Sequence, residues 1–248
     1  MMLAAALAYA RRGLPVFPLL ERDKRPFPGS SGFHDATVDP DQIRRWWART
    51  PLANVGVATG GPGGLAVLDL DRKHGDPEAM LDALAASIGA DPPATARVLT
   101  GGGGLHLWFR LRDGAELPSV NGSATAGLGV GCDLKCSGGY VVAPPSVHAS
   151  GMAYRWEDEG DNGLSAVPRA DSAWLERVCD RYQIRGGGGR AAGPTGAGGW
   201  AGRRLDWPTR KSPEAPPSPR WRLWLERGLA EAVAEIEASK AGGRHDSI

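Results

Sequence analysis

The run Gly64–Asp71 constrains the fold more than any other stretch of the chain. Five of the six residues in Leu65–Leu70 are apolar, which predicts a buried strand. Because side chains on a strand alternate between its two faces, Asp69 and Asp71 point the same way. Two adjacent carboxylates repel each other and are costly to desolvate, and a divalent cation such as Mg²⁺ relieves both effects. The run therefore predicts either a metal site at the mouth of a sheet or a strand that simply ends in polar residues.

Length, charge and cysteine content narrow the class of protein. The 248 residues can form one good-sized domain with an appendage. No apolar run approaches the ~20 residues that span a bilayer. The apolar N-terminus lacks the basic start of a signal peptide, and three cysteines predict no disulfide framework, so we expect a cytoplasmic protein without a membrane partner. Residues 1–185 carry a net charge of −2, and residues 186–248 carry a net charge of +3. Residues 1–185 are therefore not expected to bind nucleic acid through a broad basic face.

Apolar periodicity and turn residues predict an α+β fold. Asp39 before Pro40 is a helix-start signal, and Trp46 and Trp47 of that helix are expected to pack in the core. The glycine-rich run Gly60–Gly64 predicts a tight, hairpin-like connection between strands. Helices are predicted over residues 3–12, 41–49, 77–88 and 174–182, and strands over residues 14–19, 54–60, 65–70, 97–100, 105–111, 131–136, 140–143 and 154–156.

The strand predicted over residues 105–111 directly follows four glycines, Gly101–Gly104. Its apolar residues alternate with His106, Trp108 and Arg110, which therefore share the second face. Because glycine has no side chain, a ligand can approach the backbone closely beside the His106 ring. The alternative interpretation is a structural histidine that binds no ligand.

A similar arrangement recurs at residues 131–136. Asp133 and Lys135 share one face of the predicted strand and are flanked by Cys132 and Cys136. Two cysteines at this spacing could begin a zinc site. Zinc is nevertheless not expected, because Cys179 and the histidines lack the spacing of a second ligand pair.

Polar residues on otherwise apolar strands are costly to bury unless they converge on a ligand. Three carboxylates and one histidine, without a Ser-His-Asp or Cys-His pairing, favour metal-assisted phosphoryl transfer. In a two-metal site, one ion activates a 3′-hydroxyl, and the other holds a nucleoside triphosphate and stabilises the leaving pyrophosphate. We expect the histidine and nearby backbone N–H groups to hold the triphosphate.

At these positions the sequence resembles the primase-polymerase (prim-pol) domain of the archaeo-eukaryotic primase superfamily. The hhhDhD motif of that family is matched by Ala66–Asp71, and its third motif, an hhD strand, by Gly131–Asp133. Thr100–His106 matches its [S/T]-x-G-G-x-H-like motif with one additional glycine. Lys24-x-Pro26 and Gly138–Ser146 are also similar, and the resemblance extends over about residues 3–182.

The resemblance implies an RRM-like catalytic sheet with flanking helices and a small N-terminal αβ unit, within a domain of residues 1–185. It implies a template-dependent nucleotidyltransferase, a DNA primase and/or DNA polymerase, that uses single-stranded template, primer and nucleoside triphosphates to replicate plasmid, phage or other mobile DNA. Two Mg²⁺ or Mn²⁺ ions would be held by Asp69, Asp71 and Asp133. The residues that the resemblance implies for nucleotide binding are His106, Thr100, Gly102, Gly103, Lys135 and Lys24.

The C-terminal third has a different character. Residues 186–219 predict a disordered basic linker rich in Gly and Pro, and residues 220–248 an amphipathic helix. The end of the chain resembles the start of the helical segment that follows the catalytic domain in relatives, so it is interpreted as a truncated helical domain or a remnant of one. A helicase acting in trans is a candidate partner. Two alternatives remain open: a catalytically weak replication or regulatory module that binds nucleic acid or a helicase, and a two-metal nuclease.

Overall fold

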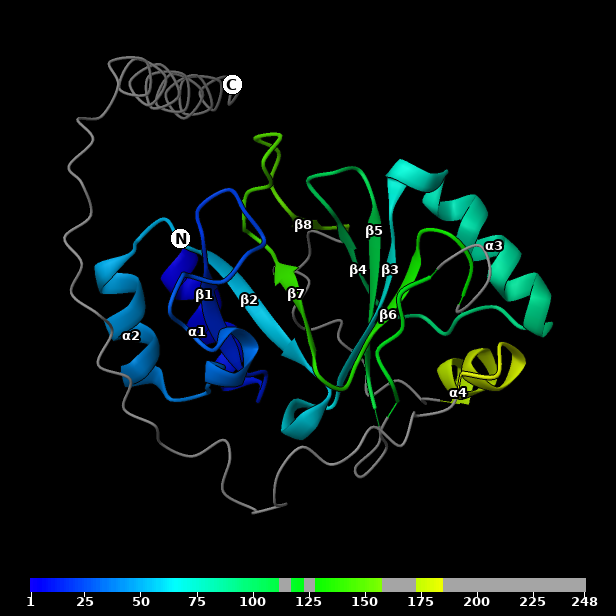
Figure 1. The fold of residues 1–248 in the computed structure, drawn as a ribbon, viewed down its shortest axis with the longest axis horizontal. Helices are drawn as coiled ribbons and strands as arrows, with labels where there is room; N and C mark the ends of the chain where they lie inside the picture. Colours follow the sequence, from blue (N-terminus) through cyan, green and yellow to red (C-terminus); the bar gives the residue numbers. More distant parts are fainter. Residues whose placement is uncertain (112–116, 123–127, 158–172, 185–248) are drawn as a thin grey trace, which may run out of the picture. The chain divides into compact units, whose positions relative to one another are not determined.

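The computed structural model describes residues 1–111, 117–122, 128–157 and 173–184, all within one compact unit of residues 1–206 (Figure 1). The linker predicted over residues 186–219 and the helix predicted over residues 220–248 lie outside the described residues. The described part contains two antiparallel sheets with helices packed against them. The predicted α+β class is therefore confirmed.

The first sheet has five antiparallel strands in the order β6-β3-β5-β4-β8. Strand β3 (Leu65–Leu70) pairs with β5 (Leu105–Arg110) on one edge and with β6 (Cys132–Lys135) on the other. Every residue of β3 except Asp69 is buried, as expected for a strand with neighbours on both edges and packing on both faces. The two remaining strands are β4 (Ala96–Leu99) and β8 (Arg155–Trp156).

The second sheet has three antiparallel strands in the order β1-β2-β7, namely β1 (Val16–Leu19), β2 (Asn54–Thr59) and β7 (Gly139–Ala143). The connection from β2 to β3 is tight and antiparallel at its base, as predicted for Gly60–Gly64, but the pairing of the two strands does not extend beyond this base. The Gly60 N–H donates to the Leu65 carbonyl at 2.6 Å in an isolated bridge, and the two strands then enter different sheets. The reason is that β2 already pairs with β1 and β7, so both of its edges are occupied.

Four helices lie close to their predicted positions: α1 (Met2–Arg11), α2 (Pro40–Arg49), α3 (Pro77–Ile88) and α4 (Ala173–Arg181). Asp39 caps α2 as predicted, because its Oδ1 accepts a hydrogen bond from the Asp41 N–H at 2.9 Å. Trp46 and Trp47 of this helix are buried, as expected. None of the described helices is both long enough and apolar enough to cross a membrane.

Two apolar clusters cover the two faces of the five-stranded sheet. The face that carries Leu68, Leu107 and Leu134 packs against α3 and α4. The face that carries Val67 and Trp108 packs against α1, α2 and the three-stranded sheet. Figure 1 shows α1 and α2 on one side of the sheets and α3 and α4 on the other. The five-stranded sheet is thus an internal layer of the molecule.

The second face of this sheet is only partly apolar. Val67 and Asp69 lie two residues apart on β3, and His106 and Trp108 lie two residues apart on β5, so each pair shares that face. The apolar members pack under the N-terminal helices, whereas the polar members lie further along the same strands. The fold therefore presents polar side chains beside a well-packed core.

Candidate active site

Asp69 stands on β3 between polar residues on both neighbouring strands. In the strand register it lies directly opposite His106 of β5 and directly opposite Asp133 of β6. Residues opposite each other in an antiparallel pair point to the same face of the sheet. The predicted convergence of these side chains on one face is therefore confirmed, and it places two carboxylates side by side.

The imidazole of His106 is buried next to Asp69. The residue is 5 % exposed, and its Nε2 atom lies 3.5 Å from Asp69 Oδ1. Burial lowers the pKa of His106, against the opposing effect of Asp69 and with a smaller lowering effect of the Lys135 cation, so the ring is neutral near pH 7. Its Nδ1 atom is buried without a hydrogen-bond partner among the described residues. Such a nitrogen carries a desolvation penalty of roughly 1–3 kcal/mol.

Asp133 is held by two donors. Lys135 Nζ lies 2.8 Å from Asp133 Oδ2, and the Gly122 N–H donates to Oδ1 at 2.7 Å. Lys135 also donates to Asn121 Oδ1 at 2.8 Å. The Lys135 cation thereby offsets the repulsion between the neighbouring carboxylates of Asp69 and Asp133.

Asp71 continues the extended backbone of β3, with φ −87° and ψ 114°. Its carboxylate accepts a hydrogen bond from the Lys73 N–H at 2.9 Å and caps a short 3₁₀ helix, η3 (Arg72–His74). The Asp71 N–H donates to the Gly131 carbonyl at 2.9 Å. This bond keeps Asp71 aligned with β6, which begins directly after Gly131. Asp71 is exposed, so a ligand can reach its carboxylate.

The three carboxylates have the chemistry of a site for a hard divalent cation. All of them line one cavity, and carboxylate oxygen is the ligand that Mg²⁺ and Mn²⁺ prefer. As the side chains of the described ranges stand, no group of three or more His, Cys, Asp or Glu residues is placed to hold a metal ion. Asp133 instead accepts a hydrogen bond from Lys135, and Asp71 accepts one from the Lys73 N–H.

The cysteines of the described part lie elsewhere. Cys132, Cys136 and Cys179 are buried, and they belong to the apolar cluster under α3 and α4. Cys132 and Cys136 are therefore on the sheet face opposite to Asp133.

The glycine turn, Gly101–Gly104, joins β4 to β5 and is closed by Thr100. The Thr100 N–H donates to the Gly104 carbonyl at 2.9 Å, and Thr100 Oγ1 accepts from the Gly104 N–H at 2.8 Å. The hydroxyl oxygen thus has a structural role. The hydroxyl hydrogen remains available to a ligand.

A cavity of about 710 Å³ lies between the two sheets, lined by β3, β5 and β6 of one and by β7 of the other. Of the residues predicted to bind nucleotide or metal, Gly103 alone does not line it. A Cβ at Gly103 would face Arg72, with the Arg72 Cγ 3.5 Å away. The predicted residues that do line the cavity are Asp69, Asp71, Thr100, Gly102, His106, Asp133, Lys135 and Lys24.

Four further side chains, Phe33, Tyr140, His148 and Tyr154, line the cavity and are missed by the sequence analysis. Phe33 and Tyr140 stack with ring centroids 6.4 Å apart at an interplanar angle of 26°, and we call this pair the aromatic wall. The Tyr140 hydroxyl donates to the Lys24 carbonyl at 3.0 Å. Tyr140 belongs to the run that resembles the prim-pol family, and His148 follows it closely, so that run is the signal that could have found them.

Tyr154 stands between two histidines. Its ring centroid lies 6.2 Å from that of His106 and 6.3 Å from that of His148. Burial raises the pKa of Tyr154 to about 12, and the negative charges of Asp69 and Asp71 contribute to the rise. The hydroxyl is therefore protonated near neutral pH and can donate a hydrogen bond to an anion.

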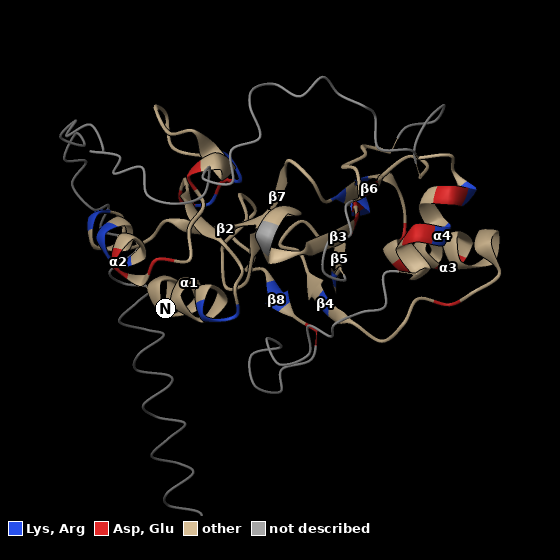
Figure 2. Cartoon of the chain, turned by 90° about the horizontal axis from the view of Figure 1, so that it is seen from below, with Lys and Arg blue, Asp and Glu red and all other residues tan. Residues whose placement is uncertain are grey.

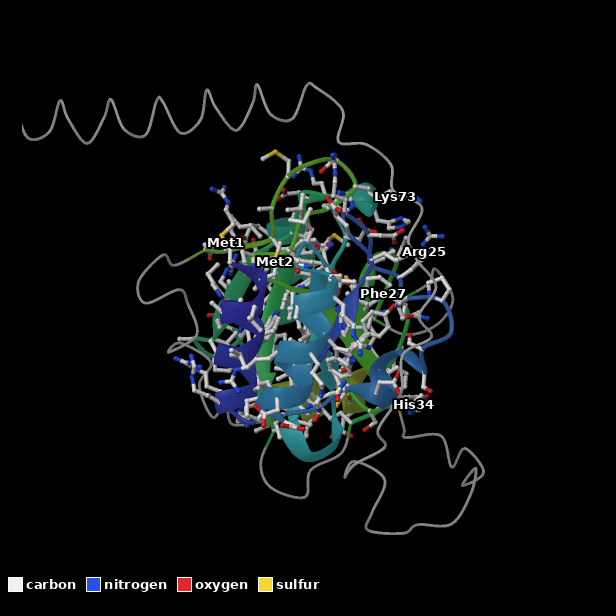
Figure 3. The ribbon with its side chains drawn as sticks, turned by 90° about the vertical axis from the view of Figure 1, so that its left-hand side faces the viewer. Met1, Met2, Arg25, Phe27, His34 and Lys73 are labelled. Atoms are coloured by element: carbon white, nitrogen blue, oxygen red, sulfur yellow. The ribbon has the colours of Figure 1, made fainter. Side chains whose placement is uncertain are left out.

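Charge on the described part is mixed rather than uniformly basic. Figure 2 shows basic residues on several helices and strands with acidic residues among them. Figure 3 shows Arg25 and Lys73 toward the same edge of the described part. Both residues adjoin the cavity lining in the sequence. Arg25 follows Lys24, and Lys73 precedes His74, and both Lys24 and His74 line the cavity. The cavity rim therefore carries basic residues, although positive charge is not confined to it.

Comparison with known proteins adds a family. The model of the family described as Bifunctional DNA primase/polymerase, N-terminal, matches residues 6–170, which is more than half of the 248 residues. The matched range includes all three carboxylates and both histidines described above. No curated protein matches the chain.

Proposed function

Since this chain belongs to the bifunctional DNA primase/polymerase N-terminal family, we propose that it adds nucleotides to the 3′-hydroxyl of a strand on a single-stranded DNA template. Family membership implies a nucleotidyltransferase with DNA and nucleotides as substrates. The observation that carries the proposal is the register that sets Asp69 opposite both His106 and Asp133, inside a cavity of about 710 Å³.

In this proposal Asp69, Asp71 and Asp133 hold two divalent ions, Mg²⁺ or Mn²⁺. When bound, these ions would activate the attacking 3′-hydroxyl and neutralise charge on the leaving pyrophosphate. The shared sheet face of Asp69 and Asp133 supports the assignment, because it orients their oxygen ligands toward the cavity. Lys135, 2.8 Å from Asp133, also contacts the triphosphate, since its ammonium has three donors.

The triphosphate would lie along the glycine turn. His106 has a neutral ring that lines the cavity beside Asp69, and in this proposal its Nε2–H donates a hydrogen bond to a phosphate oxygen. Thr100, Gly102 and Lys24 line the same cavity and can supply further donors. Tyr154 adds a protonated hydroxyl near the carboxylates.

We also propose that the five-stranded sheet is the RRM-like catalytic core of a primase. The order β6-β3-β5-β4, with α3 connecting β3 to β4, supports this interpretation. The three-stranded sheet with α1 and α2 then corresponds to the small N-terminal αβ unit.

Replacement of Tyr140 by alanine is expected to weaken nucleotide binding about tenfold. The aromatic wall offers the flat surface of the cavity, and stacking of a base on an aromatic ring contributes about 1–3 kcal/mol. The dissociation constant for dATP, measured by equilibrium dialysis, checks this result. Tyr140→Phe is the matched control, because it keeps the ring and removes only the hydroxyl that donates to Lys24. Equal affinities of the alanine variant and the unaltered protein would exclude a stacking role.

The direct test of function is incorporation of labelled dATP or ATP on a single-stranded template, with and without primer, in Mg²⁺ or Mn²⁺. The expected result is metal-dependent extension of the primer, and products without primer would establish priming. A parallel reaction with labelled primer-template, metal and no triphosphates separates synthesis from degradation. Shortening of the primer without extension would favour the nuclease alternative.

The wider setting is part of the proposal. We place the activity in the cytoplasm, in replication of plasmid, phage or other mobile DNA, with a helicase as a possible partner in trans through residues 220–248. A chain ending at residue 185 is expected to keep primer extension and to lose any such helicase association, which a pull-down with the replicon's helicase would measure.

A further inference from the structure

The β7–β8 turn (residues 147–153) forms part of the cavity wall and is fastened on two sides. The Val147 N–H donates to Asn54 Oδ1 at 2.9 Å, and Asn54 Nδ2 donates to the Val147 carbonyl at 2.8 Å. On the other side, Ser150 Oγ donates to the Gly101 carbonyl at 2.8 Å. The turn is therefore tied both to β2 and to the glycine turn, which is distant from it in sequence.

His148 of this turn has a defined ring orientation. The Ser150 N–H donates to His148 Nδ1 at 3.1 Å, and Ser150 Oγ lies 3.0 Å from the same atom. Because a backbone N–H can only donate, Nδ1 is the acceptor of this bond, which assigns the ring proton to Nε2. The Nε2 atom lies beside Gly102, 3.7 Å from the position that a Cβ would occupy there. His148 thus presents an N–H donor to the cavity at the glycine turn.

Three of the four glycines in the turn are required by the protein itself. A Cβ on Gly101 would lie 2.3 Å from the His148 Cβ, and a Cβ on Gly104 would lie 2.6 Å from a backbone carbonyl oxygen of β3. Gly103 has a φ of +83°, in the left-handed region. Gly102 is different, because a Cβ there would meet nothing closer than 3.7 Å. The missing side chain at Gly102 leaves space open beside His148 rather than relieving a clash.

The Gly102 backbone adds a second donor to this space. Its N–H donates to no acceptor among the described residues, and Gly102 is exposed at the cavity. A backbone N–H and an imidazole N–H beside the same open space can both donate to an anion.

The position of His148 relative to the carboxylates indicates which part of a nucleotide it would meet. The Tyr154 ring separates it from His106, with centroid distances of 6.3 Å and 6.2 Å to the two histidines. His106 in turn lies opposite Asp69. In the proposed reaction the carboxylates act at the α-phosphate, where the bond forms. A triphosphate that extends from there past Tyr154 along the glycine turn would bring its β- and γ-phosphates to His148.

We propose that His148 Nε2–H and the Gly102 N–H form a subsite for the β- or γ-phosphate of the incoming nucleotide. The subsite rests on the proposed nucleotidyltransferase function and adds to it a second histidine on a different element from His106. It accounts for the glycine at position 102, which the fold does not require, and for the link between the β7–β8 turn and the glycine turn. His148 binds the part of the substrate that leaves as pyrophosphate.

The test compares dATP with dAMP, because the monophosphate lacks the groups that the subsite binds. Equilibrium dialysis with the full chain and Mg²⁺ is expected to show about tenfold weaker dATP binding for His148→Ala, with unchanged dAMP binding. His148→Gln, which keeps an N–H donor at a similar reach, is expected to recover most of the affinity. Gly102→Ala is expected to melt at the temperature of the unaltered protein and to lose dATP affinity, because its methyl group fills the open space.

The outcomes separate the subsite from the proposed function. Unchanged dATP binding by His148→Ala, or an equal loss for dATP and dAMP, overturns the subsite. A primer-extension assay on the same preparations shows whether the unaltered protein incorporates nucleotides. Incorporation together with normal dATP binding by His148→Ala means that the subsite alone is wrong. Selective loss of dATP binding in a protein that incorporates nothing means that the subsite stands and the proposed function is wrong.

Discussion

Replacement of Asp69 by asparagine is expected to remove nucleotide incorporation while the protein stays folded. Asp69 is the carboxylate that faces both His106 and Asp133, so its charge is central to the proposed metal site. Loss of one electrostatic group of this kind lowers the rate by a factor on the order of 100 to 1,000. Stability should be equal or higher, because carboxylates directly opposite each other destabilise a strand pair by about 0.2–1 kcal/mol. Single-turnover incorporation and thermal unfolding measure the two effects.

Asp82→Asn is the matched control for this experiment, because Asp82 is an exposed carboxylate on α3 and does not line the cavity. It is expected to keep both activity and melting temperature. Full incorporation by Asp69→Asn in either Mg²⁺ or Mn²⁺ would contradict the assignment of Asp69 as a metal ligand. A large fall in its melting temperature would show instead that Asp69 has a structural role.

Replacement of Trp108 by alanine is expected to lower the free energy of unfolding by about 3–5 kcal/mol. Trp108 is fully buried on β5, and its ring contacts Tyr9 of α1 and Trp156 of β8, with centroid distances of 6.1 Å and 5.1 Å. It therefore links the N-terminal helix to the five-stranded sheet. Typical domains have only about 5–15 kcal/mol of stability, so the loss is a large fraction of the total. Denaturant unfolding followed by circular dichroism gives the value.

Trp108→Phe is the control that remains measurable if the alanine variant does not fold. The Trp108 Nε1 atom has no hydrogen-bond partner within the described ranges, so phenylalanine loses ring volume but no hydrogen bond to a described residue. Its loss of stability should be clearly smaller than that of alanine. An alanine variant within about 1 kcal/mol of the unaltered protein would show that the two parts of the core are held together elsewhere.

These two predictions concern the same face of the same sheet. In the register of β3 and β5, Val67 is opposite Trp108, and Asp69 is opposite His106. On this one face, the residues therefore change from apolar packing to a polar site within two positions along each strand. We expect substitutions at the first pair to change stability and substitutions at the second pair to change activity, because burial and charge are separated along the strands.

Much of the local structure could be predicted from the sequence. Side chains alternate between the two faces of a strand, and this period of two is visible in residues 65–71 and 105–111. It predicted that Asp69 shares a face with Val67, and that His106 shares a face with Trp108. The Asp39 cap and the glycine turn also depend on neighbours in the chain. These features follow from backbone geometry within a few residues. The proposal that the carboxylates and His106 form one site also depended on the resemblance of the three motifs to the prim-pol family.

The sequence by itself thus determined the strand faces and the approximate helix boundaries, and it predicted the residues that are proposed to carry the chemistry. Only the tertiary structure decided that β2 and β3 belong to different sheets, that Gly103 faces Arg72 instead of the cavity, and that Tyr140, His148 and Tyr154 join the site. The physical reason is that these outcomes depend on which strand edges are already paired and which distant turns pack together. Local periodicity carries no information on such long-range contacts.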